Sequence, residues 1–262
     1  MEMMRTLFYS IHLLKLSITG ELICDFQQFK RLWSRNLETF SKKPSKHEDE
    51  NVLVSIIVPT RNEERNLSKL LKSLSASWYR NIEVIVADYK SRDRTREVAR
   101  RYNAKVIDID KPGVGYASFV ATHHARGDII IRTDADTVFP PHIILDTVKA
   151  FKDDARVLVY HVGHFYYDGD VIDNLMAFLY DKYWRKPWNT TGHFIAFRRE
   201  IIKKVNFNPY LKYDDDWDFG KRVKESYGDQ VFLFNRYDTV LTSSRRVRKT
   251  GRLKYVLGIR IR

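Results

Sequence analysis

Cysteine is almost absent from this 262-residue chain, and long apolar runs are missing. The single cysteine, Cys24, can form neither an intramolecular disulfide nor a cysteine-based zinc site. This fits a reducing, cytoplasmic setting, although a secreted protein without disulfides would share the composition. The apolar segment 7–18 is interrupted by Ser10, His12 and Lys15, and no stretch approaches the roughly 20 apolar residues of a membrane-spanning helix. We therefore expect neither a signal peptide nor a membrane span.

Acidic residues are too few to balance the basic ones. The chain has 46 Lys and Arg against 33 Asp and Glu, a formal net charge of +13. Such a surplus calls for an anionic partner, which can be nucleic acid, a phosphate-bearing ligand or an anionic membrane surface. The basic residues are dispersed along the chain, which disfavours nucleic acid. Hydrophobic residues make up 44% of the chain, which argues against wholesale disorder.

Composition divides the chain into four segments. Residues 1–40 carry apolar side chains at the spacing of one helix face, which predicts a helical appendage begun by Asp25. Residues 41–51 are polar and contain proline, as is typical of a linker, and a compact domain is expected over residues 52–250. The basic amphipathic tail, residues 251–262, suits either a membrane surface or packing on the domain. The apolar face of the appendage comprises Phe26, Phe29, Trp33, Leu37 and Phe40.

Strand and helix patterns alternate within the compact domain. The β-branched run Val52–Val58 predicts a central parallel strand that Pro59 stops, followed by a helix capped by Asn62. This alternation predicts an α/β domain with a Rossmann-like, doubly wound, mostly parallel sheet flanked by helices. Further strands are expected at residues 82–87, 105–109 and 128–132, and further helices at about residues 95–102 and 116–126.

Polar side chains stand at the ends of three expected strands. They are Thr60-Arg61-Asn62, Asp88 and Asp134-Ala135-Asp136. Ligands of open α/β sheets bind at the carboxyl ends of the strands, so we expect these groups to converge. Two carboxylates one residue apart suit Mn²⁺ or Mg²⁺, which prefer oxygen ligands. An Asp-x-Asp alone is a weak signal because it is also common in turns.

Six segments follow one another in a characteristic order. They are VSIIVPTRNEE (54–64), DYKSRDRT (88–95), ARGDIIIRTDAD (125–136), GHFIAFRR (192–199), DDWDFGKR (215–222) and TSSRR (242–246). Together they resemble the motifs of family 2 glycosyltransferases with a GT-A fold, over residues 52 to 250.

The resemblance implies an inverting transfer of a sugar from a nucleotide-diphosphate donor, with Asp134 and Asp136 holding the metal and the diphosphate. Asp216 matches the general base that takes a proton from the acceptor hydroxyl, and Asp215 is its near competitor. Capping of the helix that follows is an alternative role for this acidic cluster, and both roles can hold at once. The donor-binding residues that the resemblance implies are Pro59, Thr60, Arg61, Asn62, Glu64, Asp88, Asp134, Ala135 and Asp136.

The chain departs from the family pattern at two places. Tyr89 stands where many members carry a second acidic residue, and Ser118-Phe119 stands where many carry Arg-Asn. These departures leave the nucleotide of the donor open.

Several further residues have two interpretations each. Arg245 and Arg246 can clamp a diphosphate or belong to a solvated basic tail. His193 and Trp217 can contact the acceptor, although burial in the core is the ordinary role of tryptophan. The strand histidines His161 and His164 favour a structural role over a metal site, because no further histidine or cysteine lies nearby in the sequence.

The leading hypothesis is a metal-dependent inverting glycosyltransferase at the cytosolic face of a membrane. Its acceptor would be a glycan hydroxyl or a lipid phosphate such as a polyprenyl phosphate, whose anionic headgroup matches the basic surplus. The alternatives are a nucleic-acid-binding basic protein and a GT-A-like interaction module without catalysis. The former would lose affinity steeply with salt, and the latter would not hydrolyse a donor.

Overall fold

The computed structural model describes residues 27–32, 34, 38 and 51–251, which contain one eight-stranded sheet of order β3-β2-β1-β4-β7-β6-β8-β5. Its strands are β1 (Val54–Thr60), β2 (Ile82–Asp88), β3 (Lys105–Asp108), β4 (Ile129–Arg132), β5 (Thr137–Val138), β6 (Val159–Tyr166), β7 (Ile195–Arg198) and β8 (Phe232–Thr242). The helices are α3 (Glu64–Ser75), α4 (Thr95–Arg101), α5 (Val114–His124), α6 (Ile143–Asp153), α7 (Val171–Tyr183), α8 (Asp215–Tyr227) and α9 (Arg245–Thr250), with the 3₁₀ turns η1 (Arg199–Lys203) and η2 (Asp229–Val231).

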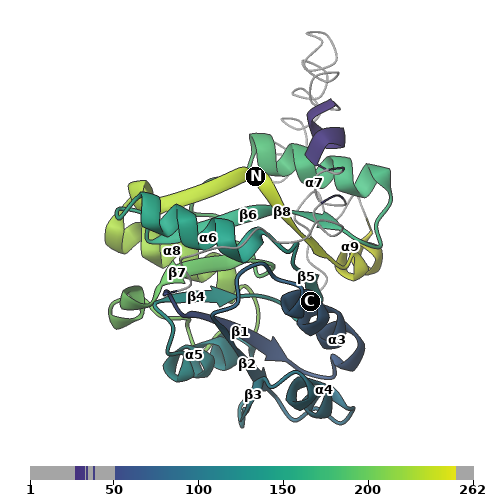
Figure 1. Cartoon of the computed structure of the whole chain (residues 1–262), viewed down its shortest axis with the longest axis vertical. Coiled ribbons are helices and arrows are strands. Elements are labelled where there is room, and N and C mark those ends of the chain that lie inside the picture. Colours follow the sequence, from purple (N-terminus) through teal and green to yellow (C-terminus); the bar gives the residue numbers. More distant parts are fainter. Residues whose placement is uncertain (1–26, 33, 35–37, 39–50, 252–262) are drawn as a thin grey trace.

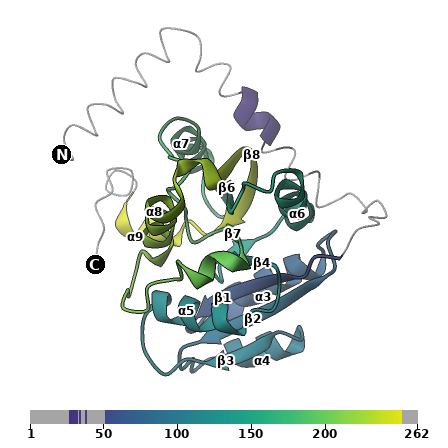
Figure 2. The same ribbon diagram turned by 90° about the vertical axis from the view of Figure 1, so that its left-hand side faces the viewer.

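The sheet has a parallel half and a mixed half. Strands β1 to β4 all run parallel, and β7 then pairs antiparallel to β4. Beyond β7, strand β6 pairs antiparallel to β7 and parallel to β8, and β5 closes the sheet antiparallel to β8. Figures 1 and 2 show the parallel half at the bottom of both views and the mixed half above it. The expected mostly parallel, doubly wound sheet is confirmed in this arrangement.

Apolar side chains cover both faces of the sheet. One core cluster joins the sheet to α3, α4 and α6, and a second joins it to α5 and α8. Strand β1 contributes side chains to both clusters: Ile56 and Val58 belong to the first and Ile57 to the second. This alternation is the period-2 pattern of a strand covered on both faces.

Strand β1 ends two residues later than its sequence indicated. The prediction that Pro59 stops this strand is wrong, because Pro59 pairs in register with Ala87 and the strand ends at Thr60. Strand β4 pairs with β1 only as far as Ile57. Beyond that point β1 has one open side, where a proline without an N–H group is tolerated.

Asn62 does not cap the helix that follows β1, so this prediction is also wrong. Helix α3 begins at Glu64 after Glu63, and Asn62 adopts a left-handed backbone with φ of 55°. Its side chain instead accepts a hydrogen bond from the N–H of Arg92, which lies in the loop after β2. Asparagine tolerates this conformation better than most residues, so it suits the turn.

The described part of the N-terminal segment is helical and packs against α7 and β6. Phe29 and Leu32 are buried with Phe165 and Phe178, and the Phe29 and Phe165 ring centroids lie 5.6 Å apart. Among the described residues, no helix has the length and apolar character needed to span a membrane. The predictions for Asp25, Phe26, Trp33, Leu37, Phe40, residues 41–50 and the tail beyond Gly251 lie outside the described residues.

Candidate functional site

The loops after β1 and β2 are joined through the buried carboxylate of Asp88. Its oxygens accept hydrogen bonds from Thr60 Oγ1 at 3.2 Å and from the N–H and hydroxyl of Ser91, and they pair with Arg96 Nε at 2.6 Å. The Ser91 hydroxyl in turn accepts from the N–H of Asn62 at 2.8 Å. Asp88 therefore fixes both loops from inside.

The side chains of Arg61 and Tyr89 pack against each other on these two loops. The Arg61 guanidinium carbon lies 5.0 Å from the centroid of the Tyr89 ring. Arg61 is exposed and Tyr89 is half-buried, so both remain accessible beside the end of β1. An arginine stacked on an aromatic ring offers a planar surface and a positive charge, which suits contact with a nucleobase or a phosphate.

Arg132 connects the carboxylates on the two sides of the site. It ends β4, and only 2% of it is exposed. Its Nη1 donates to Asp134 Oδ1 at 2.7 Å and to the carbonyl of Gly192 at 2.6 Å. Its Nη2 donates to Asp215 Oδ1 at 3.1 Å. One guanidinium thus holds Asp134, next to β4, and Asp215, at the start of α8.

Asp134 and Asp136 differ strongly in acidity. Burial opposes ionisation of Asp134, but the charge of Arg132, aided by that of Arg246, outweighs it and lowers its pKa to about 2. Burial and the charge of Asp134 raise the pKa of Asp136 to about 6, against the opposing effect of Arg245. Asp134 is therefore ionised throughout the physiological range, whereas Asp136 gains its charge near neutrality.

Helix α9 places the positively charged side chain of Arg245 beside Asp136. Arg245 Nε lies 2.9 Å from Asp136 Oδ2, and Nη2 lies 2.8 Å from Glu63 Oε1. The Arg245 side chain is 53% exposed, so it is neither a freely solvated tail residue nor a fixed buried pair. Its guanidinium shows that positive charge is accommodated beside Asp136. The oxygen ligands of Asp134 and Asp136 fit Mn²⁺ or Mg²⁺, which take further ligands from phosphate and water.

The two aspartates at the start of α8 have different surroundings. Asp215 is buried, and Ser118 Oγ donates to its second oxygen at 2.8 Å. Burial raises the pKa of Asp215 to about 6, although Arg132 opposes the shift. Asp216 is half-buried, and its carboxylate accepts from the N–H of Gly192 at 2.6 Å and of Trp217 at 2.9 Å. Asp215 and Asp216 lie in the first turn of α8, where carboxylates favour the macrodipole, but no side-chain capping hydrogen bond forms at its N-cap, Asp214.

The segment before β7 closes the site from the other side. Thr133 Oγ1 donates to the carbonyl of His193, and Nδ1 of His193 lies 3.6 Å from Asp134 Oδ2. The His193 side chain is largely enclosed, and its ring centroid is 4.8 Å from that of His164. A β-carbon at Gly192 would collide with Nη1 of Arg132, so glycine allows this close approach.

The remaining predicted residues lie in varied positions. Glu64 pairs with Arg94 at 3.0 Å, and its neighbour Glu63 is the residue that contacts Arg245. Ala135 is buried in the core, and Trp217 is 40% exposed beside Asp216. His161 and His164 are buried on β6, as expected for structural histidines.

Sequence reasoning missed Arg132, Glu63, Gly192 and the role of Ser118. The one available signal was Arg132 itself, a charged residue at the end of the apolar run Ile129–Ile131. A buried arginine needs partners, so its position indicated nearby acceptors.

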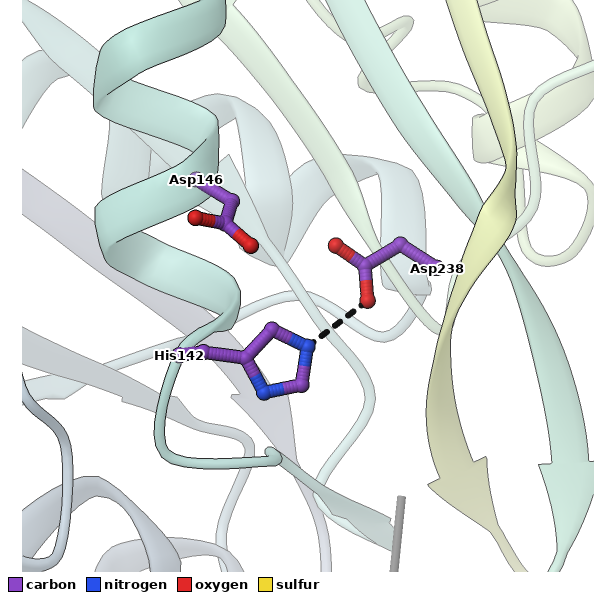
Figure 3. A group of neighbouring side chains, drawn as sticks. All are labelled: His142, Asp146 and Asp238. Atoms are coloured by element: carbon purple, nitrogen blue, oxygen red, sulfur yellow. Dashed lines mark hydrogen bonds and ion pairs between the residues drawn. The ribbon is translucent and has the colours of Figure 1, made fainter. Parts of the chain in front are cut away.

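A separate group of ionisable side chains lies between α6 and β8. His142 Nε2 and Asp238 Oδ1 are 2.8 Å apart, and Asp146 lies nearby, with one possible ligand atom from each residue within 4.8 Å of the others (Figure 3). Nδ1 of His142 has no hydrogen-bond partner among the described residues. Metal-binding histidines almost always donate their second N–H, so this arrangement favours a tether between α6 and β8 over a metal centre.

Comparison with known proteins supplies an independent line of evidence. The model of glycosyl transferase family 2 matches residues 55–206. A 4,4'-diaponeurosporenoate glycosyltransferase of Staphylococcus haemolyticus is 38% identical over 131 residues, covering 47% of this chain and 33% of that protein. A dolichol-phosphate mannosyltransferase of Pyrococcus furiosus is 30% identical over 177 residues, covering 60% of this chain and 49% of that protein. The chain thus matches half or less of the length of these relatives.

Solved structures share the fold. A mannosyltransferase of Pyrobaculum calidifontis, in complex with GDP-Man and Mn²⁺, aligns with a TM-score of 0.59 at 22% identity, over 89% of this chain and 71% of that one. Glucosyl-3-phosphoglycerate synthase of Mycobacterium tuberculosis, in complex with Mn²⁺, UDP-glucose and phosphoglyceric acid, aligns with a TM-score of 0.56 at 19% identity, over 80% and 81% of the two chains. At such identities the likeness establishes the fold, which is the GT-A fold.

Proposed function

The chain belongs to glycosyl transferase family 2, and from that membership we propose that it moves a sugar from a nucleotide-diphosphate donor to an acceptor with inversion at the anomeric carbon. The observation that carries the proposal is the position of Arg132 between two carboxylate pairs. The strand-end pair suits a diphosphate donor with its cation. The pair on α8 suits an acceptor that must lose a proton. A single-displacement transfer needs both groups within one site.

The donor half comprises the ends of β1, β2 and β4. In this proposal Asp134 and Asp136 hold Mn²⁺ or Mg²⁺, and such an ion, when bound, neutralises charge that develops on the leaving diphosphate. Arg61 and Tyr89 form the surface for the nucleoside, and Asp88 keeps the two loops in place. Arg245 and Arg246 are close enough to act on the same carboxylates electrostatically, which supports the proposal that they contact the diphosphate.

The acceptor half favours Asp216 over Asp215 as the general base. The oxygens of Asp215 are engaged by Arg132 and Ser118 inside the protein. Asp216 is half-buried and next to the partly exposed Trp217, so an acceptor can reach it. Asp216 takes the acceptor proton while the acceptor oxygen bonds to the anomeric carbon and the bond to the diphosphate breaks.

The acceptor is proposed to be a glycan hydroxyl or a polyprenyl phosphate. The second class is supported by the dolichol-phosphate mannosyltransferase among the relatives and by the net charge of +13. The same charge would hold the protein at the anionic, cytosolic face of a membrane. A phosphate acceptor is already ionised at neutral pH, so it would depend less on Asp216.

Thermal unfolding with nucleotide sugars tests the proposal. UDP-glucose, UDP-GlcNAc and GDP-mannose are each added with and without Mn²⁺. At a hundredfold excess over Kd, the matching donor should raise Tm by about 5 °C or more, because it binds the folded state alone. The rise should require Mn²⁺. If no donor changes Tm in either condition, and none is hydrolysed during long incubation, the proposed activity is wrong.

A further inference from the structure

We propose that Arg132 is a positioning residue that couples cation binding at Asp134 to the acceptor side of the site, and that Asp215 is its counter-ion. The inference rests on the proposed function. It assigns Arg132 no contact with substrate, because the side chain is enclosed by protein and only 2% exposed.

The burial of Arg132 needs an explanation other than stability. It is the largest of the fully buried side chains, and its Nε has no hydrogen-bond partner among the described residues. A buried ion pair is often no more stabilising than apolar side chains of similar volume. An arginine at the end of an otherwise apolar β4 is therefore best explained by what it holds in place.

Arg132 reaches both sides of the site through short contacts. Nη1 binds Asp134 and the carbonyl of Gly192, while Nη2 binds Asp215. The N–H of Gly192 donates to Asp216. A displacement of the guanidinium would therefore move Asp134, Asp215 and the peptide that supports Asp216 together.

The charges determine whether a change at Asp215 strengthens or weakens cation binding at Asp134. One guanidinium is shared between two carboxylates, and a cation at Asp134 competes with it for the charge of that carboxylate, whose Oδ1 Arg132 already binds. If Asp215 loses its charge, Arg132 keeps a single carboxylate partner and should bind Asp134 more strongly. Cation binding should then weaken, although Asp215 lies on the acceptor side and need not touch the cation.

A double-mutant cycle measures this coupling. Binding of Mn²⁺ with UDP, and separately with GDP, is measured by calorimetry for the wild type, Asp215→Asn, Arg132→Met and the double variant. We expect Asp215→Asn to weaken Mn²⁺-dependent binding about five- to tenfold in the wild-type background, and less than twofold when Arg132 is Met. Equal losses in both backgrounds would overturn the inference. Asp218→Asn is the matched control, because it removes a charge from the same helix but pairs with Arg222.

A conservative variant separates positioning from folding. Arg132→Lys keeps the charge, but an ammonium lacks the fork that reaches both carboxylates. We expect Tm within about 5 °C of the wild type, nucleotide affinity within threefold, and hydrolysis of the donor slowed at least tenfold. Unchanged hydrolysis, or a loss explained by unfolding, would contradict a positioning role. Absence of Mn²⁺–nucleotide binding in the wild type would instead refute the proposed function, so the two failures are distinguishable.

Discussion

The two aspartate pairs are built on one plan and differ in detail. Each pair has one member bound to Arg132, Asp134 on the β4 side and Asp215 on α8, and one member that Arg132 does not bind. On α8 the unbound member, Asp216, is the more exposed one, whereas Asp136 is more buried than Asp134. Yet Asp134 has its pKa lowered to about 2, whereas burial raises that of Asp215 to about 6. A shared guanidinium therefore does not make its partners equivalent.

The difference comes from the other charges around each carboxylate. Arg246 assists Arg132 in stabilising ionised Asp134. Around Asp215, the charge of Asp216 adds to the effect of burial. The surroundings thus keep Asp134 ionised near neutrality, whereas Asp215 has a raised pKa although it pairs with the same guanidinium.

The largest expected effect is on the transfer rate, and it concerns Asp216 rather than Asp215. Asp216→Asn should slow transfer to a hydroxyl acceptor by about 10²- to 10⁴-fold and leave Mn²⁺-dependent donor binding within about twofold, because only the proton acceptor is lost. Turnover and calorimetry on the same preparation check this. Near-normal transfer would exclude a hydroxyl acceptor that needs this base and would favour the polyprenyl phosphate.

Removing the Arg132 guanidinium, which binds one aspartate of each pair, should destabilise the protein. Arg132→Met leaves the buried carboxylate of Asp215 and the half-buried carboxylate of Asp134 without their common partner, which should cost about 3 kcal/mol in the free energy of unfolding. Urea unfolding measures the loss. The comparison variant Arg132→Met/Asp215→Asn should recover part of it, since one of the unpaired charges is removed. No recovery would mean that the two side chains do not act as a pair.

Asp136 should make donor binding depend on pH. Its pKa of about 6 lies above the ordinary 3.8, so the folded metal-free protein holds a proton that the unfolded chain has released between these values. Stability from this group is present below pH 3.8 and is lost as pH rises through 6. Cation binding needs the ionised form, so Mn²⁺–nucleotide affinity should fall about tenfold per pH unit below 6 and level off above it. Calorimetry from pH 5 to 8 checks this, and constant affinity would contradict it.

The smallest expected effect concerns the exposed arginine of α9. Arg245→Ala should change the free energy of unfolding by about 1 kcal/mol, because more than half of the Arg245 side chain is exposed to solvent. Nucleotide affinity should nevertheless fall about three- to tenfold if the guanidinium turns to the diphosphate. Arg248→Ala, which removes a charge from the same helix but pairs with Asp168, is the control. Equal losses of nucleotide affinity in the two variants would mean that Arg245 acts only through the overall surface charge and not through contact with the diphosphate.

Much of the fold followed from local pattern. The alternation of β-branched runs and helical spacing located the strands of the parallel half, because parallel strands covered on both faces are apolar throughout. The pattern misjudged Pro59, since the open side of β1 depends on where β4 stops pairing. It also misjudged Asn62, whose partner Arg92 lies 30 residues away.

The site was predictable where its residues end strands. Asp88 ends β2, and Asp134 and Asp136 follow the end of β4, so the rule for open α/β sheets assigned them to the same edge of the sheet. The links made by Arg132 were not predictable in this way. Its partners Gly192 and Asp215 are 60 and 83 residues distant, and no local pattern encodes those contacts. Glu63 was missed for the same reason, since Arg245 is 182 residues away.

In the proposed function, Asp134 and Asp136 hold the cation that binds the donor diphosphate. Calorimetry of Mn²⁺ with UDP and with GDP, on the wild type and on Asp136→Ala, tests this assignment. We expect binding to the wild type that requires Mn²⁺, and at least a hundredfold weaker binding to the variant, because one of two carboxylate ligands is lost. Equal Mn²⁺-dependent binding by both proteins would contradict it.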